Sequence, residues 1–291
     1  MMTLTQLEIF SKLAELKNFT HTAQLLNISQ SAISHALKSL EKKWHTQLFY
    51  RNNNEVELTA AGQRLLPYAN EILTVAHMIQ QEVMDLKGLK TGTLRIGSFG
   101  ASSSNVLIPL ILKQFAQHYP EVEVLVMEGT DKDVLQWIDE RKVDLGFVVL
   151  PETRFDSFAL LEDIFVALLP NDLEIAQKSA IQLQELLDHP FIMTSAGSQN
   201  HVMELFKAAQ LTPQIKYNLS QIMSILNMVN QGAGVSIVAD LALDTNILSL
   251  YPNVVKRPLS PNIKRSIGLA VKNKQQMSPT AKAFVELAVQ L

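Results

Sequence analysis

The feature that most constrains this chain is a helix-turn-helix pattern in its first residues. Apolar side chains recur every three or four residues over positions 4–16, which indicates an amphipathic helix. A short second helix follows, which Thr20 can cap, and the segment Asn27-Ile28-Ser29 interrupts it. Residues 30–43 then predict a third helix with one apolar and one polar face. We therefore expect a three-helix bundle at the start of the chain.

The third predicted helix is suited to the major groove of DNA. Its apolar stripe contains Ile33, Leu37 and Leu40, and small polar side chains stand at its N-terminal end. Such a helix fits a groove about 12 Å wide, where Gln30 could pair with an adenine edge. Lys38 could reach a phosphate. Any three-helix bundle also has a polar face, so a purely structural bundle remains the alternative.

A short hairpin is expected after this helix. Residues 47–51 and 55–58 read as strands, and Arg51-Asn52-Asn53-Asn54 forms the turn because asparagine tolerates left-handed backbone. This hairpin predicts a wing whose Arg51 contacts the DNA backbone or minor groove, unless it serves only to stabilise the bundle. Residues 1–54 carry a net charge of +3 and residues 91–291 one of −4, which weakly favours a polyanion as partner of the first part.

Composition narrows the class of protein. The 291 residues are enough for two domains of ordinary size, and 47% of them are hydrophobic. No apolar run approaches the roughly 20 residues of a membrane span, and the first residues do not resemble a secretory leader. The chain has no cysteine, which excludes disulfides and thiolate chemistry. We expect a soluble, cytoplasmic protein.

A long helix is predicted to connect the two parts. Thr59 is a plausible N-cap, and residues 59–87 contain no strong break except Pro67. Seven apolar residues follow a four-three spacing that is typical of a coiled coil and favours dimerisation over packing within one chain. These seven residues, called the seam below, are Leu65, Ala69, Ile72, Ala76, Ile79, Val83 and Leu86. Residues 87–92 read as a hinge.

Strand-like and helix-like segments alternate from residue 91 to the end, which predicts parallel sheets covered by helices. Two rounds of alternation indicate two α/β lobes, with crossing segments near residues 151–161 and 262–267. Ligands of such sheets bind beyond the carboxyl ends of the strands. Three hydroxyl-rich loops stand there and could hold a small polar or carboxylate ligand through Ser102, Ser103, Thr130, Thr194 and Ser195. No Arg or Lys lies in these loops.

Enzyme motifs are missing from the sequence. Gly232-Ala233-Gly234 lies between a predicted helix and a strand, which reverses the order of a dinucleotide-binding motif. No nucleophile elbow or histidine metal spacing occurs, and Asp131 and Asp133 start a predicted helix, where acids usually cap. We therefore expect no enzyme and no cofactor. A solute-binding protein with a helical appendage and a cofactorless enzyme acting in the cleft remain alternatives.

At this point the sequence resembles a known family. Phe19-Thr20, the run Ser29-Gln30-Ser31-Ala32-Ile33-Ser34, Leu48-Phe49 and Leu58-Thr59 with Gly62 stand in the order of the DNA-binding head of LysR-type transcriptional regulators. The resemblance implies that Gln30, Ser31, Ser34 and His35 contact bases or phosphates, with Arg51 on the wing. It also implies a regulatory half with a fold like that of periplasmic binding proteins, a small-molecule effector and a homodimer, usually a dimer of dimers.

The chain departs from the family pattern at several positions. Ser31 replaces the usual proline, and Trp44-His45 replaces a Leu-Gly pair. The glycine normally ends the recognition helix with a positive φ, which a histidine adopts only at a cost of about 1 kcal/mol. We therefore expect the third helix to end differently in this chain.

These inferences combine into one α/β architecture with three parts. Residues 1–58 form a mostly α winged helix-turn-helix that binds double-stranded promoter DNA, and residues 59–90 form the dimerisation helix and hinge. Residues 91–291 form a two-lobed effector domain, with lobe I at about 91–160 and 267–291 and lobe II at about 161–266.

Overall fold

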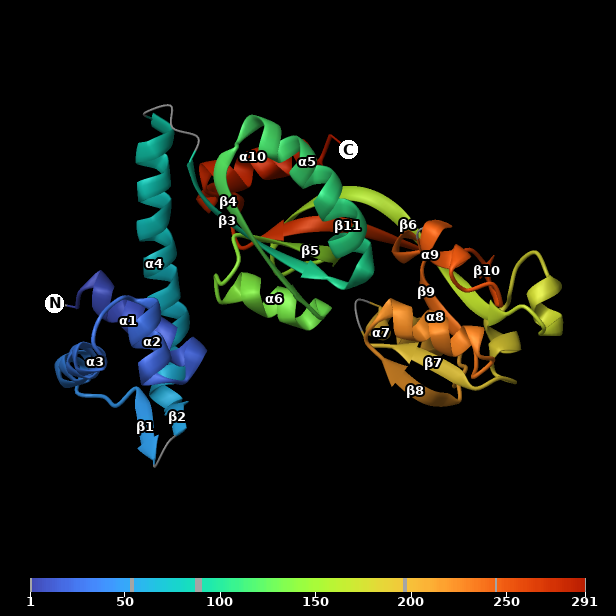
Figure 1. The fold of residues 1–291 in the computed structure, drawn as a ribbon, viewed down its shortest axis with the longest axis horizontal. Helices are drawn as coiled ribbons and strands as arrows, with labels where there is room; N and C mark the ends of the chain where they lie inside the picture. Colours follow the sequence, from blue (N-terminus) through green and yellow to red (C-terminus); the bar gives the residue numbers. More distant parts are fainter. Residues whose placement is uncertain (1, 53–54, 87–90, 196–197, 244, 291) are drawn as a thin grey trace. The chain divides into compact units, whose positions relative to one another are not determined.

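The computed structural model describes residues 2–52, 55–86, 91–195, 198–243 and 245–290 (Figure 1). The chain forms two compact units. The first consists of Met1–Leu89 with Asp139–Lys142, and the second of Lys90–Ile138 with Val143–Leu291. No helix among the described residues is both long and apolar enough to span a membrane.

The first unit begins with the three predicted helices and the hairpin, together called the head. They are α1 (Leu4–Leu16), α2 (Phe19–Leu25), α3 (Gln30–Trp44), β1 (Phe49–Asn52) and β2 (Glu55–Leu58), with the two strands antiparallel. The head core is built from the side chains of several of these elements, among them Leu7, Phe10, Leu13, Leu37, Leu40 and Phe49. The spacing of apolar residues therefore predicted the buried faces of α1 and α3, except that Leu4 at the start of α1 is exposed.

Local hydrogen bonds explain where the head helices start. The backbone N–H of Ala32 donates to Ser29 Oγ at 3.2 Å, so Ser29 caps α3 as expected. The cap of α2 is Asn18, whose Oδ1 accepts from the N–H of His21 at 3.0 Å. The expectation that Thr20 caps this helix was wrong, because α2 begins one residue before Thr20 and already has its acceptor.

The end of α3 also differs from expectation. His45 adopts the left-handed conformation with φ 50° and ψ 36°, and its N–H donates to the carbonyls of Glu41 and Lys42. The helix thus ends in the conformation that glycine usually provides, and the expectation of a different ending was wrong. The hydrogen bonds that the His45 N–H donates to these two carbonyls offset the cost of about 1 kcal/mol of placing a residue other than glycine in this conformation.

The connecting helix α4 (Ala60–Leu86) is continuous through Pro67 and about 40 Å long at 1.5 Å per residue. Thr59 caps it, because the N–H of Gly62 donates to Thr59 Oγ1 at 3.0 Å. A Cβ on Gly62 would lie 2.2 Å from the backbone oxygen of Leu48, so only glycine allows this close approach of helix and hairpin. Residues 87–90, most of the expected hinge, lie outside the described part.

In the described part of the second unit, seven strands form one sheet with helices on its faces (Figure 1). Its first half consists of β3 (Thr91–Phe99), α5 (Ile108–His118), β4 (Glu121–Gly129), α6 (Asp131–Asp139) and β5 (Leu145–Leu150). β3 pairs in parallel with both β4 and β5. A π-helical segment, Ser102–Leu107, joins β3 to α5 and places Ser102 and Ser103 directly beyond the end of the strand.

Two long strands connect the lobes. β6 (Asp156–Pro170) pairs along its first part with β11 (Lys264–Val271), and along its last part with β9 (Ser236–Ala239) and β10 (Val254–Pro258). β11 is antiparallel to β5 and β6, so the sheet is mixed and not the purely parallel one expected. β6 packs against the core of the first lobe up to Leu161 and against that of the second lobe from Ile164 onward, directly after the expected first crossing at 151–161.

The second lobe is completed by the small parallel pair β7 (Phe191–Thr194) and β8 (Ile215–Leu219), with α7 (Gln199–Ala208) and α8 (Ile222–Asn230). This lobe also contains β10, the short helix α9 (Thr245–Ser249) and a 3-10 turn at Leu183–Leu186. The last helix, α10 (Pro279–Ala288), returns to the first lobe, where Phe284 packs edge-on against Phe115.

Candidate functional site

A pocket lies beyond the carboxyl end of β3, between the two lobes of the second unit. It encloses about 360 Å³ of empty space, part of it open to solvent. The pocket is lined by polar groups from both lobes and by an apolar wall. The lining residues are Phe99, Gly100, Ala101, Ser102, Thr194, Ser198, Ser220, Ile222, Val238, Ala239, Ala242 and Arg265. We call it the Arg265 pocket.

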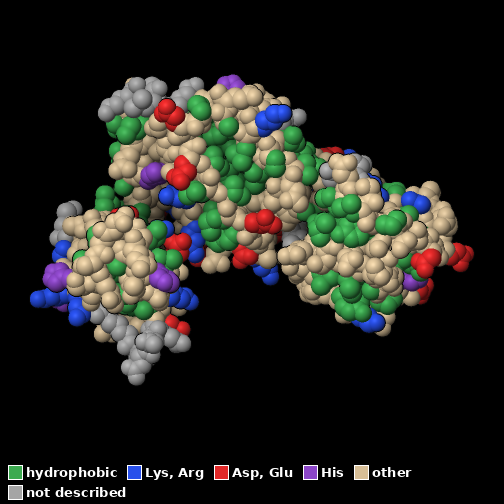
Figure 2. All heavy atoms as spheres, in the orientation of Figure 1, with side chains coloured by type: hydrophobic (Ala, Val, Ile, Leu, Met, Phe, Trp, Pro, Cys, Tyr) green, Lys and Arg blue, Asp and Glu red, His purple; other side chains and the backbone are tan. Residues whose placement is uncertain are grey.

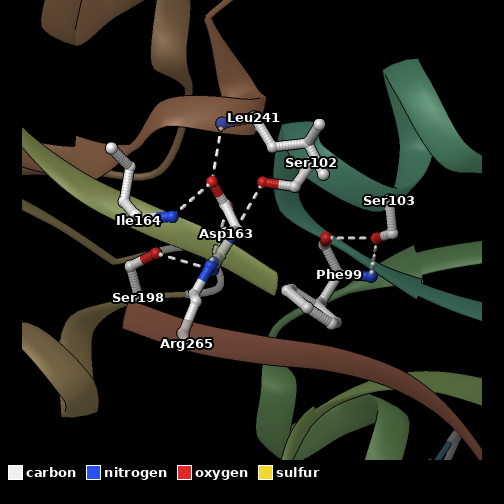
Figure 3. A network of polar contacts seen from close by, with 8 residues as sticks. All are labelled: Phe99, Ser102, Ser103, Asp163, Ile164, Ser198, Leu241 and Arg265. Atoms are coloured by element: carbon white, nitrogen blue, oxygen red, sulfur yellow. Dashed lines mark hydrogen bonds and ion pairs between the residues drawn. The ribbon is translucent and has the colours of Figure 1, made fainter. Parts of the chain in front are cut away.

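Arg265 joins the two lobes at this pocket (Figure 3). Its guanidinium donates to Asp163 Oδ2 from Nε at 3.0 Å and from Nη2 at 2.8 Å. Nη2 also donates to Ser102 Oγ of the first lobe at 2.6 Å, and Nη1 to Ser198 Oγ of the second lobe at 3.4 Å. A single side chain on a crossing strand therefore contacts both walls of the pocket.

Asp163 holds Arg265 in position. The two residues are register partners on β6 and β11, and Arg265 and Asp163 are only 5% and 6% exposed. Asp163 Oδ1 accepts two further hydrogen bonds, from the N–H of Ile164 at 2.8 Å and from that of Leu241 at 3.0 Å. Both oxygens of the Asp163 carboxylate therefore accept hydrogen bonds from the protein itself. The carboxylate also neutralises the charge of Arg265, which faces the pocket.

The structure brings together only part of the predicted ligand set. Ser102 and Thr194 line the pocket. Ser103 is fully buried beside them, but its hydroxyl donates to the carbonyl of Phe99 and accepts from the N–H of the same residue. Its hydroxyl is therefore committed to holding the π-helical turn against β3.

The other two predicted ligand residues do not line the pocket. Thr130 belongs to the cap of α6, since its Oγ1 donates to Asp133 Oδ2 at 2.7 Å and accepts from the N–H of Asp133 at 3.2 Å. The hydrogen bonds that Asp133 Oδ2 accepts from the hydroxyl and from the N–H of Thr130 lower the pKa of Asp133. Ser195 follows β7, and its N–H donates to the carbonyl of Leu219. Residues 196 and 197 of the same predicted loop lie outside the described part.

Sequence reasoning missed Arg265, Asp163 and Ser198. The predicted loops contain no basic residue, because the arginine comes from the crossing strand β11, 163 positions from the serine it contacts. The available signal was the expected second crossing at 262–267, which contains Arg265. Among the described residues, no group of three His, Asp or Glu side chains is placed to hold a metal ion.

The predicted recognition face of α3 lies on the surface of the head. Gln30, Ser31, His35 and Lys38 are exposed and Ser34 is half-buried, whereas Ile33, Leu37 and Leu40 on the other face are fully buried. Figure 2 shows basic and histidine side chains at the edge of the first unit, where Figure 1 places α3. Ser31 Oγ also lies 2.9 Å from the capping Ser29 Oγ. The side chain of Arg51 on β1 lies outside the described part.

The seam divides into two sections along α4. Ala69 is buried in the head core, and Leu65 packs against the same core. Further along, Ile72, Ile79, Val83 and Leu86 are exposed, Ile79 to 61% and Leu86 to 80%. The first section therefore fixes the helix to its own head, and the second leaves an apolar stripe on the surface of the chain.

Comparisons with known proteins agree with this architecture. The family model described as "Bacterial regulatory helix-turn-helix protein, lysR family" matches residues 4–63, and the "LysR substrate binding domain" matches residues 87–291. The uncharacterized HTH-type transcriptional regulator YvbU of Bacillus subtilis (strain 168) is 32% identical over 100% of this chain and 99% of its own. The probable HTH-type transcriptional regulator LrrA of Synechococcus elongatus is 32% identical over 98% of this chain and 96% of its own.

Solved structures share the fold along the whole chain. A full-length variant of OxyR from Pseudomonas aeruginosa has a TM-score of 0.76 at 22% identity and covers 100% of this chain and 97% of its own. Full-length CbnR in complex with its target DNA has a TM-score of 0.66 at 22% identity, with 99% of both chains covered. The fold class and the family expected from the sequence are confirmed: the chain belongs to the LysR family of bacterial transcriptional regulators.

Proposed function

We propose that the chain regulates transcription by reading promoter DNA with α3 and by responding to a small polar effector in the Arg265 pocket. The proposal that α3 reads DNA rests on the contrast between its apolar and polar faces. Its apolar face is completely buried, whereas amide, hydroxyl and imidazole side chains stand exposed on the other. Gln30, Ser31, Ser34, His35 and Lys38 are the proposed contacts to DNA, together with Arg51 of the wing.

Replacing Gln30 with alanine tests the reading of bases. If its side-chain amide pairs with an adenine edge, the variant loses about 1–3 kcal/mol of binding free energy on the specific site and little on random DNA. Fluorescence anisotropy with both DNAs measures the difference. Gln80→Ala removes an exposed amide from α4 and serves as the matched control. Equal losses on both DNAs in the Gln30 variant would make this residue a backbone contact.

The effector half of the proposal rests on the position of the Arg265 pocket. It lies at the crossing strands, and Arg265 contacts Ser102 of one lobe and Ser198 of the other. A ligand bound there would favour one arrangement of the lobes over another. A change in lobe arrangement would alter the surfaces through which dimers pair, and thereby the spacing of heads and the bend of DNA.

A thermal-shift screen of small carboxylates tests the effector site. We expect at least one compound to raise the melting temperature of the wild type. Its effect should shrink in Ser102→Ala, which removes a hydroxyl from the pocket wall. Ser249→Ala, an exposed serine outside the pocket, is the control. A compound whose shift is the same in Ser102→Ala would place the effector elsewhere, and Ser103, Thr130, Thr194 and Ser195 would then be substituted in turn.

The remaining parts of the proposal concern assembly and place of action. The exposed section of the seam joins two chains into a homodimer, and pairs of dimers form the family's usual dimer of dimers. The protein acts in the cytoplasm, where bacterial promoter DNA lies. The relatives are named as transcriptional regulators, which supports a role without catalysis and disfavours both a cofactorless enzyme and a solute-transport component.

A further inference from the structure

The sequence of α3 contains one acidic residue, Glu41, although this helix is proposed to approach a polyanion. Its lysines are Lys38, Lys42 and Lys43. A carboxylate close to phosphate groups weakens DNA binding, because like charges repel each other. An acid on this helix therefore requires a physical explanation.

The hydrogen bonds of Glu41 supply this explanation. Its Oε1 accepts from the N–H of Leu48 at 2.9 Å and from the N–H of Phe49 at 3.4 Å. Leu48 is fully buried, and Phe49 is the first residue of β1. A buried N–H that loses its acceptor costs free energy, so these bonds hold the backbone in place. The carboxylate thus fixes the start of the hairpin to the last turn of α3.

Glu41 lies on a different side of α3 from the face proposed to enter the groove. It follows the fully buried Leu37 by four residues, so these two side chains lie on the same side of the helix. The exposed Lys42 follows the exposed His35 by seven residues, nearly two full turns, and shares the recognition face with it. The half-buried acid therefore stands beside the recognition face and contacts the hairpin.

The start of α4 holds the same backbone segment from the other side. The N–H of Thr59, the N-cap of α4, donates to the carbonyl of Leu48 at 2.9 Å. Thr59 Oγ1 donates to the carbonyl of Gln47 at 2.7 Å. The two backbone groups of Leu48 are thus bound by different helices, its N–H by α3 and its carbonyl by the start of α4. The place of the hairpin follows from both helices, and Glu41 makes the hydrogen bonds from α3.

We propose that Glu41 is a positioning residue for DNA binding. It holds the wing where the wing contacts the DNA backbone while α3 occupies the major groove, and it touches no DNA itself. Without its acceptor oxygen, α3 still reads bases, but the wing no longer keeps its phosphate contact. This inference rests on the proposed DNA-binding function and adds how the two elements that contact DNA are held together.

Two substitutions of similar size separate the acceptor from the charge. Glu41→Gln keeps an oxygen that can accept from both N–H groups, whereas Glu41→Met removes the acceptor and the charge. Fluorescence anisotropy of the full-length protein with the DNA upstream of its own gene measures affinity at several salt concentrations. We expect Glu41→Met to bind at least about tenfold more weakly, and its slope of log affinity against log salt to fall by about one, for the lost phosphate contact. Glu41→Gln should bind at most about twofold more weakly than the wild type, with an unchanged slope, because the acceptor is kept.

Glu8→Met is the matched control, because Glu8 is an exposed acid on α1 of the same head, and both affinity and slope should stay unchanged. A mere loss of stability lowers the fraction of folded protein without changing the slope. An unchanged slope in a folded Glu41→Met protein would therefore overturn the inference. Binding by Glu41→Gln that is more than about tenfold weaker than the wild type would overturn it as well, even if Glu41→Met failed to fold. In both cases the preference of the wild type for this DNA over a scrambled duplex would stand, and only its absence would contradict the proposed function.

Discussion

Replacing Asp163 with alanine is expected to lower the free energy of unfolding of the second unit by about 3–5 kcal/mol, because it leaves the buried charge of Arg265 without its partner. The substitution also removes the acceptor for the N–H groups of Ile164 and Leu241. A domain is typically stable by about 5–15 kcal/mol, so this loss is a large part of the total. We expect no comparable effect from any single surface substitution.

Urea unfolding in a Trp44→Phe background measures this loss. The chain has two tryptophans, and Trp137 of α6 then reports on the second unit alone. Glu162→Ala is the control, since its ion pair with Lys264 joins residues on either side of the Asp163–Arg265 pair on the same two strands but is exposed. We expect little change from this control.

A double substitution distinguishes the destabilisation caused by an unpaired buried charge from that caused by lost packing. Asp163→Leu with Arg265→Met removes both charges and should recover much of the stability lost in Asp163→Ala, because no unpaired ion is then buried. If Asp163→Ala unfolds at the same urea concentration as Glu162→Ala, the pair does not hold the crossing strands together.

The second large effect is expected at the exposed section of the seam. Ile79→Asp should weaken the dimer by at least about a hundredfold, because the interface would have to bury an unpaired carboxylate against apolar side chains. Ile79 is 61% exposed within one chain, so the fold of the single chain should tolerate the change. The variant should also bind its DNA site more weakly, since one head would act without the other.

Sedimentation equilibrium over a range of concentrations measures the association. Gln80→Asp adds the same charge at the next position, which lies outside the four-three spacing and is exposed. It should leave the dimer almost unchanged. A dimer of Ile79→Asp as tight as that of Gln80→Asp would mean that α4 does not join the chains.

The head could be predicted well from sequence because its structure depends on local patterns. The spacing of Ile33, Leu37 and Leu40 marks a buried helix face, and Ser29 marks the start of α3. His45 shows the limit of this reasoning. His45 adopts the left-handed conformation because its N–H then donates hydrogen bonds to the last carbonyls of α3.

The pocket was harder to predict because its polar network joins distant positions. Arg265, Asp163 and Ser102 meet only through the pairing of β6 with β11 and the end of β3, which no local pattern reveals. Thr130 was a different case. The run Thr130-Asp131-Lys132-Asp133 matches a capping box, so its sequence already offered a competing use for the hydroxyl.

The central claim is that α3 reads a DNA sequence, and a competition experiment with the purified wild-type protein tests it most directly. The DNA upstream of its own gene and a scrambled duplex of equal length and composition compete for the protein at moderate, fixed salt. The account predicts a preference of roughly a thousandfold or more for the promoter DNA. Equal competition by the scrambled duplex would contradict it.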